Sequence, residues 1–147
     1  MARAKPKVFL DASVLIAAVL SSKGGSSYIL TQFREDFEFL ANDYTFEEAS
    51  SVLQRKFPGR NDLANNLFLL VGLTPIRILP DPPGDIVLSL APLIHVEDAP
   101  ILASALAHSS YLITLDHDFF AESVMALSRR KGLAIMKPKE FIEQHRG

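Results

Sequence analysis

The chain has 147 residues, of which 48% are hydrophobic and 22% are charged, and this composition is typical of one folded domain spanning residues 1–147. With a net charge of -2, the protein as a whole does not attract polyanions. A polyanion would therefore have to be bound by local basic patches or through a metal ion. The absence of cysteine excludes disulfide bonds, thiolate zinc sites and cysteine nucleophiles.

The first predicted strand covers residues 7–10 and ends at a carboxylate, Asp11. A short apolar run between polar residues is typical of a strand that is buried on both faces of a parallel sheet. Ligand sites in such sheets lie beyond the carboxyl ends of the strands, where Asp11 stands. A helix is predicted over residues 14–20, with Ser13 as its N-cap.

Strands and helices alternate along the rest of the chain. Apolar periodicity and Gly/Pro signals predict helices over residues 26–35, 45–56, 62–71, 85–90, 98–108 and 119–130, and from residue 138 onward. The predicted strands are residues 37–40, 75–79, 111–115 and 133–136. Asn42 and Asp43 are interpreted as a turn, and Asn61 or Asp62 as a helix cap. This order indicates an α/β three-layer sandwich, with a central parallel sheet of four or five strands flanked by helices.

Two predicted strands bring aspartates to the same edge of the sheet, Asp11 after the first strand and Asp116 after the strand over residues 111–115. Each also has a structural interpretation, because aspartate commonly begins turns and caps helices. Asp98 precedes a helix and reads as its N-cap, although a helix leading into that strand also begins near the carboxyl edge. Asp118 could share an ion with Asp116 or cap the helix that follows.

Glu48 is open to two interpretations in the same way. Thr45 and Glu48 have the spacing of a capping box, in which Glu48 would accept a hydrogen bond from the backbone N–H of Thr45. Spacing alone favours that cap. Glu47 points about 100° away on the same helix and could take either role.

Grouped carboxylates repel one another, and their pKa values rise unless a cation neutralises them. An all-oxygen set without Cys or paired His suits Mg²⁺ or Mn²⁺ better than zinc. Such ions activate water and stabilise an in-line displacement at a phosphate. The sequence contains no G-x-S-x-G elbow, P-loop or dinucleotide-binding glycine motif, which excludes those alternatives.

Four segments of the chain resemble, in order, the motifs of PIN-domain ribonucleases. They are residues 8–15 with Asp11, 45–53 with Glu48, 97–106 with Asp98, and 111–120 with Asp116. The family's glutamate lies five residues before a leucine, which selects Glu48 over Glu47. The resemblance extends over residues 7–141 and is greatest to VapC-type toxins, which are small single-domain proteins paired with an antitoxin.

This resemblance implies a Mg²⁺- or Mn²⁺-dependent endoribonuclease, the toxin component of a toxin–antitoxin pair. Its implied partners are an RNA substrate, a cognate antitoxin and a second copy of the chain. It also implies which residues form the site: Asp11, Glu48, Asp98 and Asp116 as catalytic metal ligands, Asp118 as a supporting ligand, and Ser13 and Thr114 as residues that hold carboxylates or water in place.

Substrate contacts are less specific. The local basic clusters, Arg55-Lys56 with Arg60 and Arg129-Arg130-Lys131, could contact RNA phosphates. Equally, they could be solvated helix ends that interact with the helix dipole. The apolar helices over residues 14–20 and 63–71 could carry a dimer interface or belong to the core.

Two other functions fit parts of the pattern. The first is a catalytically inactive PIN-like module that binds RNA or protein, although the complete acidic set disfavours it. The second is a receiver-like phosphoacceptor domain. Such a domain has an acidic pair after its first strand and a lysine after its last, and neither feature is clear in this sequence.

The sequence also bears on location. A membrane-spanning helix needs about 20 consecutive apolar residues, and no apolar run in the sequence is that long. The basic N-terminus precedes an apolar segment, but Asp11 interrupts that segment, which disfavours a signal peptide. We therefore expect a soluble, cytoplasmic protein without membrane contact.

Overall fold

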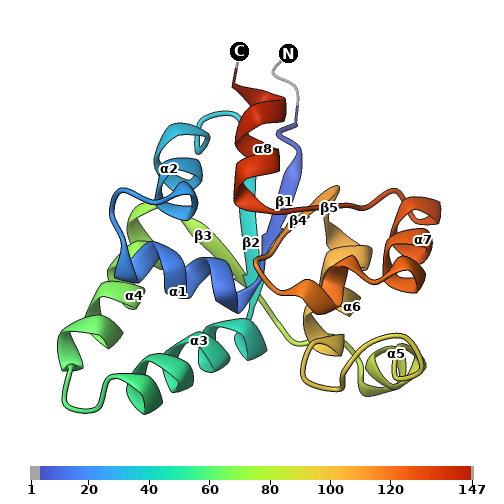
Figure 1. Ribbon diagram of the computed structural model, residues 1–147, viewed down its shortest axis with the longest axis horizontal. Helices are drawn as coiled ribbons and strands as arrows, with labels where there is room; N and C mark the ends of the chain where they lie inside the picture. The colour runs from blue at the N-terminus through green and yellow to red at the C-terminus, as the bar shows by residue number, and fades with distance from the viewer. Residues whose placement is uncertain (1–3, 147) are drawn as a thin grey trace.

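A five-stranded parallel sheet forms the centre of the computed structural model, which describes residues 4–146, and helices cover both of its faces (Figure 1). The strand order is β3-β2-β1-β4-β5. The strands are β1 (Lys7–Leu10), β2 (Glu38–Asn42), β3 (Ile76–Leu79), β4 (Tyr111–Ile113) and β5 (Ala134–Met136). The helices are α1 (Ala12–Leu20), α2 (Gly25–Gln32), α3 (Asp43–Lys56), α4 (Asn61–Leu73), α5 (Gly84–Ser89), α6 (Ala99–His108), the 3₁₀ helix η1 (His117–Phe120), α7 (Glu122–Arg130) and α8 (Pro138–His145). The predicted α/β sandwich is confirmed.

The central strand β1 divides the hydrophobic core into two halves. Successive side chains of a strand point to opposite faces of the sheet. Val8 and Leu10 pack into a cluster with α1, α2, α3, α4 and α8, whereas Phe9 packs with α5, α6 and α7 on the other face. All three are fully buried, which explains why β1 is an uninterrupted apolar run.

The topology creates a switch point beside β1. The chain proceeds from β1 outward to β2 and β3, then returns to the other side of β1 as β4. Leu10 pairs with Ile113, and the N–H of Asp11 donates to the carbonyl of Ile113 at 3.1 Å. The carboxyl ends of β1 and β4 therefore lie side by side, at the place where open α/β sheets bind their ligands.

Two predicted helix starts are wrong. Asp11, not Ser13, is the N-cap residue of α1, which begins at Ala12. Asn42 does not form a turn with Asp43. It is instead the last residue of β2 and the N-cap of α3, with its side chain accepting from the N–H of Thr45. The strand therefore runs directly into the helix, and α3 begins two residues earlier than expected.

Other boundaries also differ from the prediction. The helix expected over residues 119–130 is divided into η1 and α7, because Asp116 caps a short 3₁₀ turn before the chain starts a new helix at Glu122. Arg60, rather than Asn61 or Asp62, is the N-cap residue of α4, and it forms an ion pair with Asp62 at 2.8 Å. Helix α2 ends at Gln32, three residues earlier than expected.

Helix α4 is apolar on two sides. Leu63 and Leu67 belong to the core, whereas Phe68, Leu69 and Leu73 are 66%, 57% and 71% exposed. Its apolar character thus serves the core only in part.

Within residues 4–146, no single helix is long and apolar enough to cross a membrane. Only α1 and α2 taken together reach that length and composition, and they are bent by 95°.

Candidate metal centre

The carboxylate of Asp11 is held by hydroxyl groups from two elements. Its Oδ2 accepts hydrogen bonds from Ser13 Oγ at 2.6 Å and from Thr114 Oγ1 at 2.8 Å. Each hydroxyl oxygen in turn accepts a backbone N–H, Ser13 from Leu115 and Thr114 from Asp116, both at 3.0 Å. These bonds join the start of α1 to the segment after β4 and fix the rotation of the Asp11 carboxylate.

Asp11 is only 4% exposed, and burial raises its pKa, while the hydrogen bonds from Ser13 and Thr114 act in the opposite direction. No ion pair joins Asp11 to a basic side chain within residues 4–146. A buried carboxylate that receives hydrogen bonds but no ion pair is one that a cation would stabilise.

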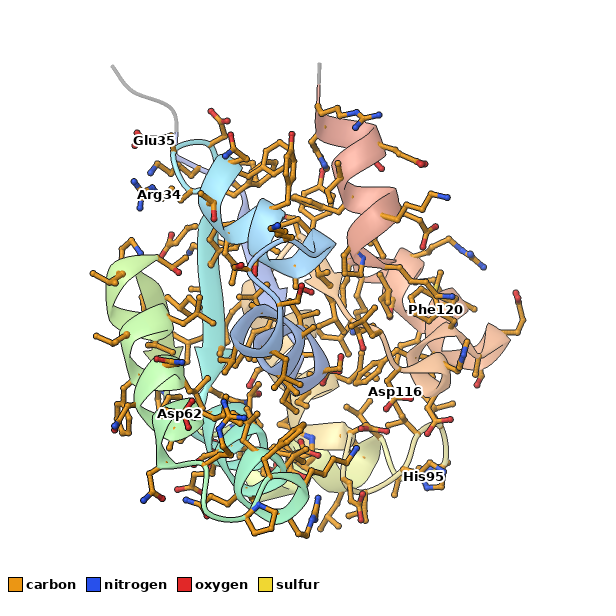
Figure 2. The ribbon with its side chains drawn as sticks, turned by 60° about the vertical axis from the view of Figure 1, so that its left-hand side comes forward. Arg34, Glu35, Asp62, His95, Asp116 and Phe120 are labelled. Atoms are coloured by element: carbon orange, nitrogen blue, oxygen red, sulfur yellow. The ribbon has the colours of Figure 1, made fainter. Side chains whose placement is uncertain are left out.

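Asp98, Asp116 and Asp118 converge from α6 and η1. Each offers a carboxylate oxygen, and these oxygens all lie within 4.8 Å of one another. Asp116 and the neighbouring His95 lie at the end of the molecule opposite the chain termini (Figure 2). Asp116 Oδ1 accepts the N–H of Asp118 at 3.0 Å, which folds the two carboxylates toward the same side. Asp118 is also 3.7 Å from His95 Nε2.

Asp98 is 9% exposed, and its side chain makes no capping hydrogen bond to α6, so the N-cap interpretation is wrong for the side chain. The pKa of Asp98 is raised to about 7, first by burial and then by the negative charges of Asp116, Asp11 and Asp118. Its carboxylate therefore faces other acids instead of the backbone.

Glu48 does not form the capping box that its spacing to Thr45 suggests, because Asn42 occupies the N-cap position. Glu48 Oε2 is buried and has no hydrogen-bond partner among the described residues. Burial and the charges of Asp11, Glu97 and Asp116 raise the pKa of Glu48 to about 7, and Arg55 acts weakly against them. A buried polar atom without a partner is costly, so this oxygen fits a role as a ligand.

The predicted acids thus lie at one end of the sheet and form two groups. Asp98, Asp116 and Asp118 form the tight group, while Asp11 and Glu48 are near enough for their charges to raise the pKa of Asp98. All donors are carboxylate oxygens, a set that suits Mg²⁺ or Mn²⁺. The catalytic and metal-binding roles of these residues stay predictions.

Sequence reasoning missed Asn42, which is fully buried and connects three elements. Its Oδ1 accepts from the N–H and the hydroxyl of Thr45 at 2.8 and 2.6 Å. Its Nδ2 donates to Ser104 Oγ at 2.8 Å and to the carbonyl of Pro100 at 3.2 Å. Asn42 therefore sets α3, which carries Glu48, against α6. Its position three residues before Thr45 was an N-cap signal in the sequence.

Tyr44 was also missed. Its hydroxyl donates to the carbonyl of Glu97 at 2.6 Å, and its N–H donates to Asp81 Oδ1 at 2.8 Å. Burial and the charges of Glu48, Glu97 and Asp98 raise the pKa of this phenol to about 12. Tyr44 thus stays protonated and holds the residue before Asp98 against α3.

The two basic clusters differ in position. Arg55 lies in the last turn of α3 and lines a hollow of about 400 Å³ together with Tyr44, Glu48 and Glu97, whereas Lys56 is exposed beside it. Arg129 and Arg130 end α7, and Arg129 lies 3.4 Å from Glu122 of the same helix. Arg55 is therefore the predicted RNA contact that adjoins the acidic side chains.

Comparison with known families matches residues 8–122 to the PIN domain. This match covers most of the chain and includes all four acidic segments, so the protein belongs to the PIN domain family. A search of curated proteins finds no match.

Solved structures show the same fold. PAE2754 from Pyrobaculum aerophilum has a TM-score of 0.65 and 23% identity, over 95% of this chain and 88% of that one. VapBC2 from Rickettsia felis, crystallised with a DNA fragment from its promoter, has a TM-score of 0.67 and 14% identity, over 89% of this chain and 98% of that one.

Proposed function

We propose that this PIN-domain protein is a metal-dependent endoribonuclease that hydrolyses RNA phosphodiesters. The observation that carries the proposal is the convergence of Asp98, Asp116 and Asp118 within 4.8 Å, next to a buried Glu48 oxygen that lacks a partner. No lysine or arginine within residues 4–146 forms an ion pair with these four acids. Such a charge distribution is stabilised by a divalent cation.

A bound Mg²⁺ or Mn²⁺ would supply Lewis acidity and an activated water for attack on a phosphate. The residues of the chain hold the geometry for that reaction. Ser13 and Thr114 fix Asp11, and the N–H of Asp118 fixes Asp116. Asn42 holds α3, which carries Glu48, against α6, which follows Asp98. We propose Asp11, Glu48, Asp98 and Asp116 as the metal ligands, with Asp118 in support.

RNA is the substrate that we propose, because phosphodiesters are anionic and Arg55 adjoins the acids where a flanking phosphate would pass. The resemblance to VapC-type toxins supports a role as the toxin of a toxin–antitoxin pair. The fold shared with VapBC2 is consistent with that role. We propose that the exposed apolar residues Phe68, Leu69 and Leu73 contact a protein partner, either an antitoxin or a second copy of the chain.

The test is cleavage of labelled single-stranded RNA in Mn²⁺, Mg²⁺ or EDTA, with wild type, Asp98→Asn and Asp116→Asn. We expect cleavage only with wild type and metal, and a loss of at least about 100-fold in each variant. Asp62→Asn is the matched control, because Asp62 is an exposed acid on α4 outside the acidic site.

Equal cleavage by wild type and both variants would place the activity elsewhere. RNA binding without cleavage under any metal condition would instead favour the inactive RNA-binding module.

A further inference from the structure

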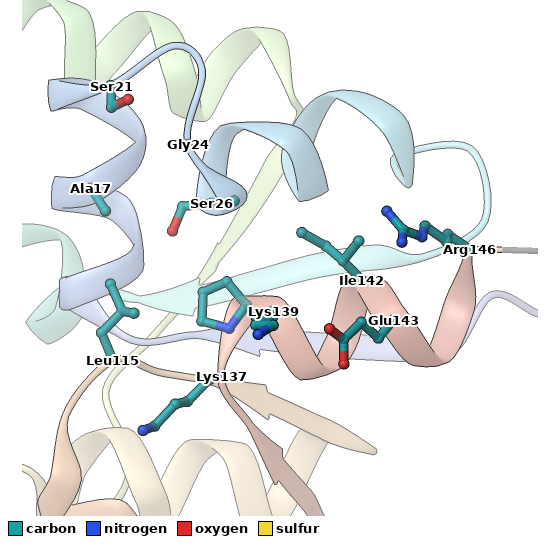
Figure 3. A pocket seen from close by; sticks show the side chains of 12 residues that line it. Ala17, Ser21, Gly24, Ser26, Leu115, Lys137, Lys139, Ile142, Glu143 and Arg146 are labelled. Atoms are coloured by element: carbon teal, nitrogen blue, oxygen red, sulfur yellow. The ribbon is translucent and has the colours of Figure 1, made fainter.

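A second pocket lies at the C-terminal end of α1 and shares no lining residue with the hollow beside Glu48. It has a volume of about 580 Å³ and is enclosed by the end of α1, the start of α2 and helix α8 (Figure 3). This volume is within the range of pockets that bind small organic ligands. Ala17, Leu115, Pro138 and Ile142 give it apolar walls, and Lys137, Lys139 and Arg146 place three cations around it against one carboxylate, Glu143.

The start of α2 presents polar groups to this pocket. Gly24 is the N-cap residue and no side chain caps the helix, so the first N–H groups of α2 have no side-chain acceptor. The start of α2 packs against α8, because a Cβ at Gly25 would be in van der Waals contact with Pro138, at 3.4 Å. Uncapped helix starts attract anions such as phosphate.

Ser26 provides an independent sign of a ligand. It is only 4% exposed, it lines the pocket, and its hydroxyl points from α2 into the open space (Figure 3). Within residues 4–146 no hydrogen bond involves Ser26 Oγ, whereas the neighbouring Ser27 hydroxyl bonds to carbonyl groups in and after α1. A hydroxyl on a largely buried residue that faces a pocket without a protein partner is available to bond to a molecule that fills the pocket.

The pocket and the acidic site share a wall. Leu115 lines the pocket and directly precedes Asp116, and its N–H donates to Ser13 Oγ, which itself donates to Asp11. Ala17 lies about one helical turn beyond Ser13, a rise of about 5.4 Å. The pocket is therefore connected to the acidic site through Leu115 and Ser13.

We infer that this pocket binds one nucleotide of the RNA strand next to the bond that is cleaved, an inference that rests on the proposed function. The base lies against Ala17, Leu115 and Ile142. The phosphate of the same nucleotide accepts hydrogen bonds from the backbone N–H groups at the start of α2 and from Ser26 Oγ. It also pairs with Lys139. Mixed apolar walls and cations suit a nucleotide, which combines a flat base with a charged phosphate.

The test measures binding of a short fluorescein-labelled single-stranded RNA to the full chain carrying Asp116→Asn, so that binding is measured without cleavage. In this background Ser26→Ala is expected to weaken binding about tenfold, because one hydrogen bond to a charged group is lost. Lys139→Gln is expected to reduce the slope of log K against log salt by about 0.7, which corresponds to one phosphate contact on a single strand. Lys5→Gln is the matched control, since Lys5 precedes β1 at the opposite end of the sheet.

A variant that fills the pocket tests the base position. Ala17→Met adds apolar volume without charge, so we expect an unchanged or higher melting temperature and RNA binding at least as weak as that of Ser26→Ala. RNA containing 4-thiouridine is expected to crosslink to peptides that contain Leu115 or Ile142.

The outcomes separate the two proposals. If wild type cleaves RNA but Ser26→Ala, Lys139→Gln and Ala17→Met bind it like Lys5→Gln, the pocket assignment is wrong and the ribonuclease stands. If RNA is neither bound nor cleaved, both proposals fail. If Ala17→Met abolishes binding of a protein partner and leaves RNA binding unchanged, the pocket is a protein-docking site and the inference is overturned.

Discussion

Asp98→Asn is expected to stabilise the metal-free protein at neutral and alkaline pH. The pKa of Asp98 rises from its ordinary value of 3.8 to about 7, so the folded protein disfavours the ionised form that prevails in the unfolded chain. Between these values the folded state retains a proton that the unfolded state has lost. Stability therefore falls as the pH rises through this window and is lowest above about pH 7.

The size of the effect follows from the two pKa values. Their difference corresponds to about 4 kcal/mol of unfavourable ionisation in the folded state. The charge of Glu48 contributes to the raised pKa of Asp98, so replacing Asp98 also removes the repulsion between these two groups. Asparagine retains the volume and polarity of aspartate. After the cost of burying a new amide, we expect a net gain on the order of 2 kcal/mol, or roughly 4–8 °C in melting temperature.

The assay is urea or thermal unfolding in EDTA at several pH values between about 4 and 8, with Asp62→Asn as the control for loss of one acid. Wild type is expected to lose stability across this range, and Asp98→Asn to lose much less. Added Mn²⁺ is expected to raise the stability of wild type more than that of the variant, because the ion binds only the folded site. Equal pH profiles for wild type and Asp98→Asn in EDTA would refute the idea that uncompensated charge surrounds Asp98.

Three further substitutions test the parts of the site separately. Thr114→Val keeps the shape of the side chain but leaves the N–H of Asp116 without its acceptor. We therefore expect a loss of about 1–3 kcal/mol in unfolding free energy and a lower cleavage rate. Unchanged values for both would show that this hydroxyl does not hold the site. Asn42→Ala removes the N-cap of α3 and the bond to Ser104. We expect the unfolding free energy, measured by chemical denaturation, to fall by about 2 kcal/mol or more. A decrease below about 0.5 kcal/mol would contradict the role assigned to Asn42. Glu48→Gln is expected to abolish RNA cleavage without lowering the melting temperature, with Glu47→Gln as an active control, and an active Glu48→Gln would remove Glu48 from the proposed ligands.

Much of the fold follows from local patterns in the sequence. Buried apolar runs alternate with helical periodicity, and parallel strands joined by helices bring their carboxyl ends to one edge. The sequence alone therefore places Asp11 and Asp116 at that edge. The same reasoning predicted the layers of the sandwich, because the central strand β1 is apolar on both faces.

Helix caps were less predictable, since several residues near a helix start can compete for the same N–H groups. Thr45 and Glu48 matched a capping box, but Asn42 lies where β2 ends and takes the N–H of Thr45 first. Its amide also reaches Ser104, 62 residues further along the chain, and no local pattern indicates such a contact. Glu48 is released from a capping role by the local bond between Asn42 and Thr45, whereas the position of α3 against α6 depends on the long-range bond to Ser104.

The acidic edge itself was determined by the sequence, because strand polarity and burial are local properties that a single chain segment already shows. Tertiary structure decided which acids meet, since the distance between Asp98 and Asp116 depends on how α6 packs against the sheet. It also decided that Ser26 is a largely buried residue that lines a pocket, together with Leu115, the residue before Asp116. Such pockets form only where helices from distant parts of the chain leave space between them.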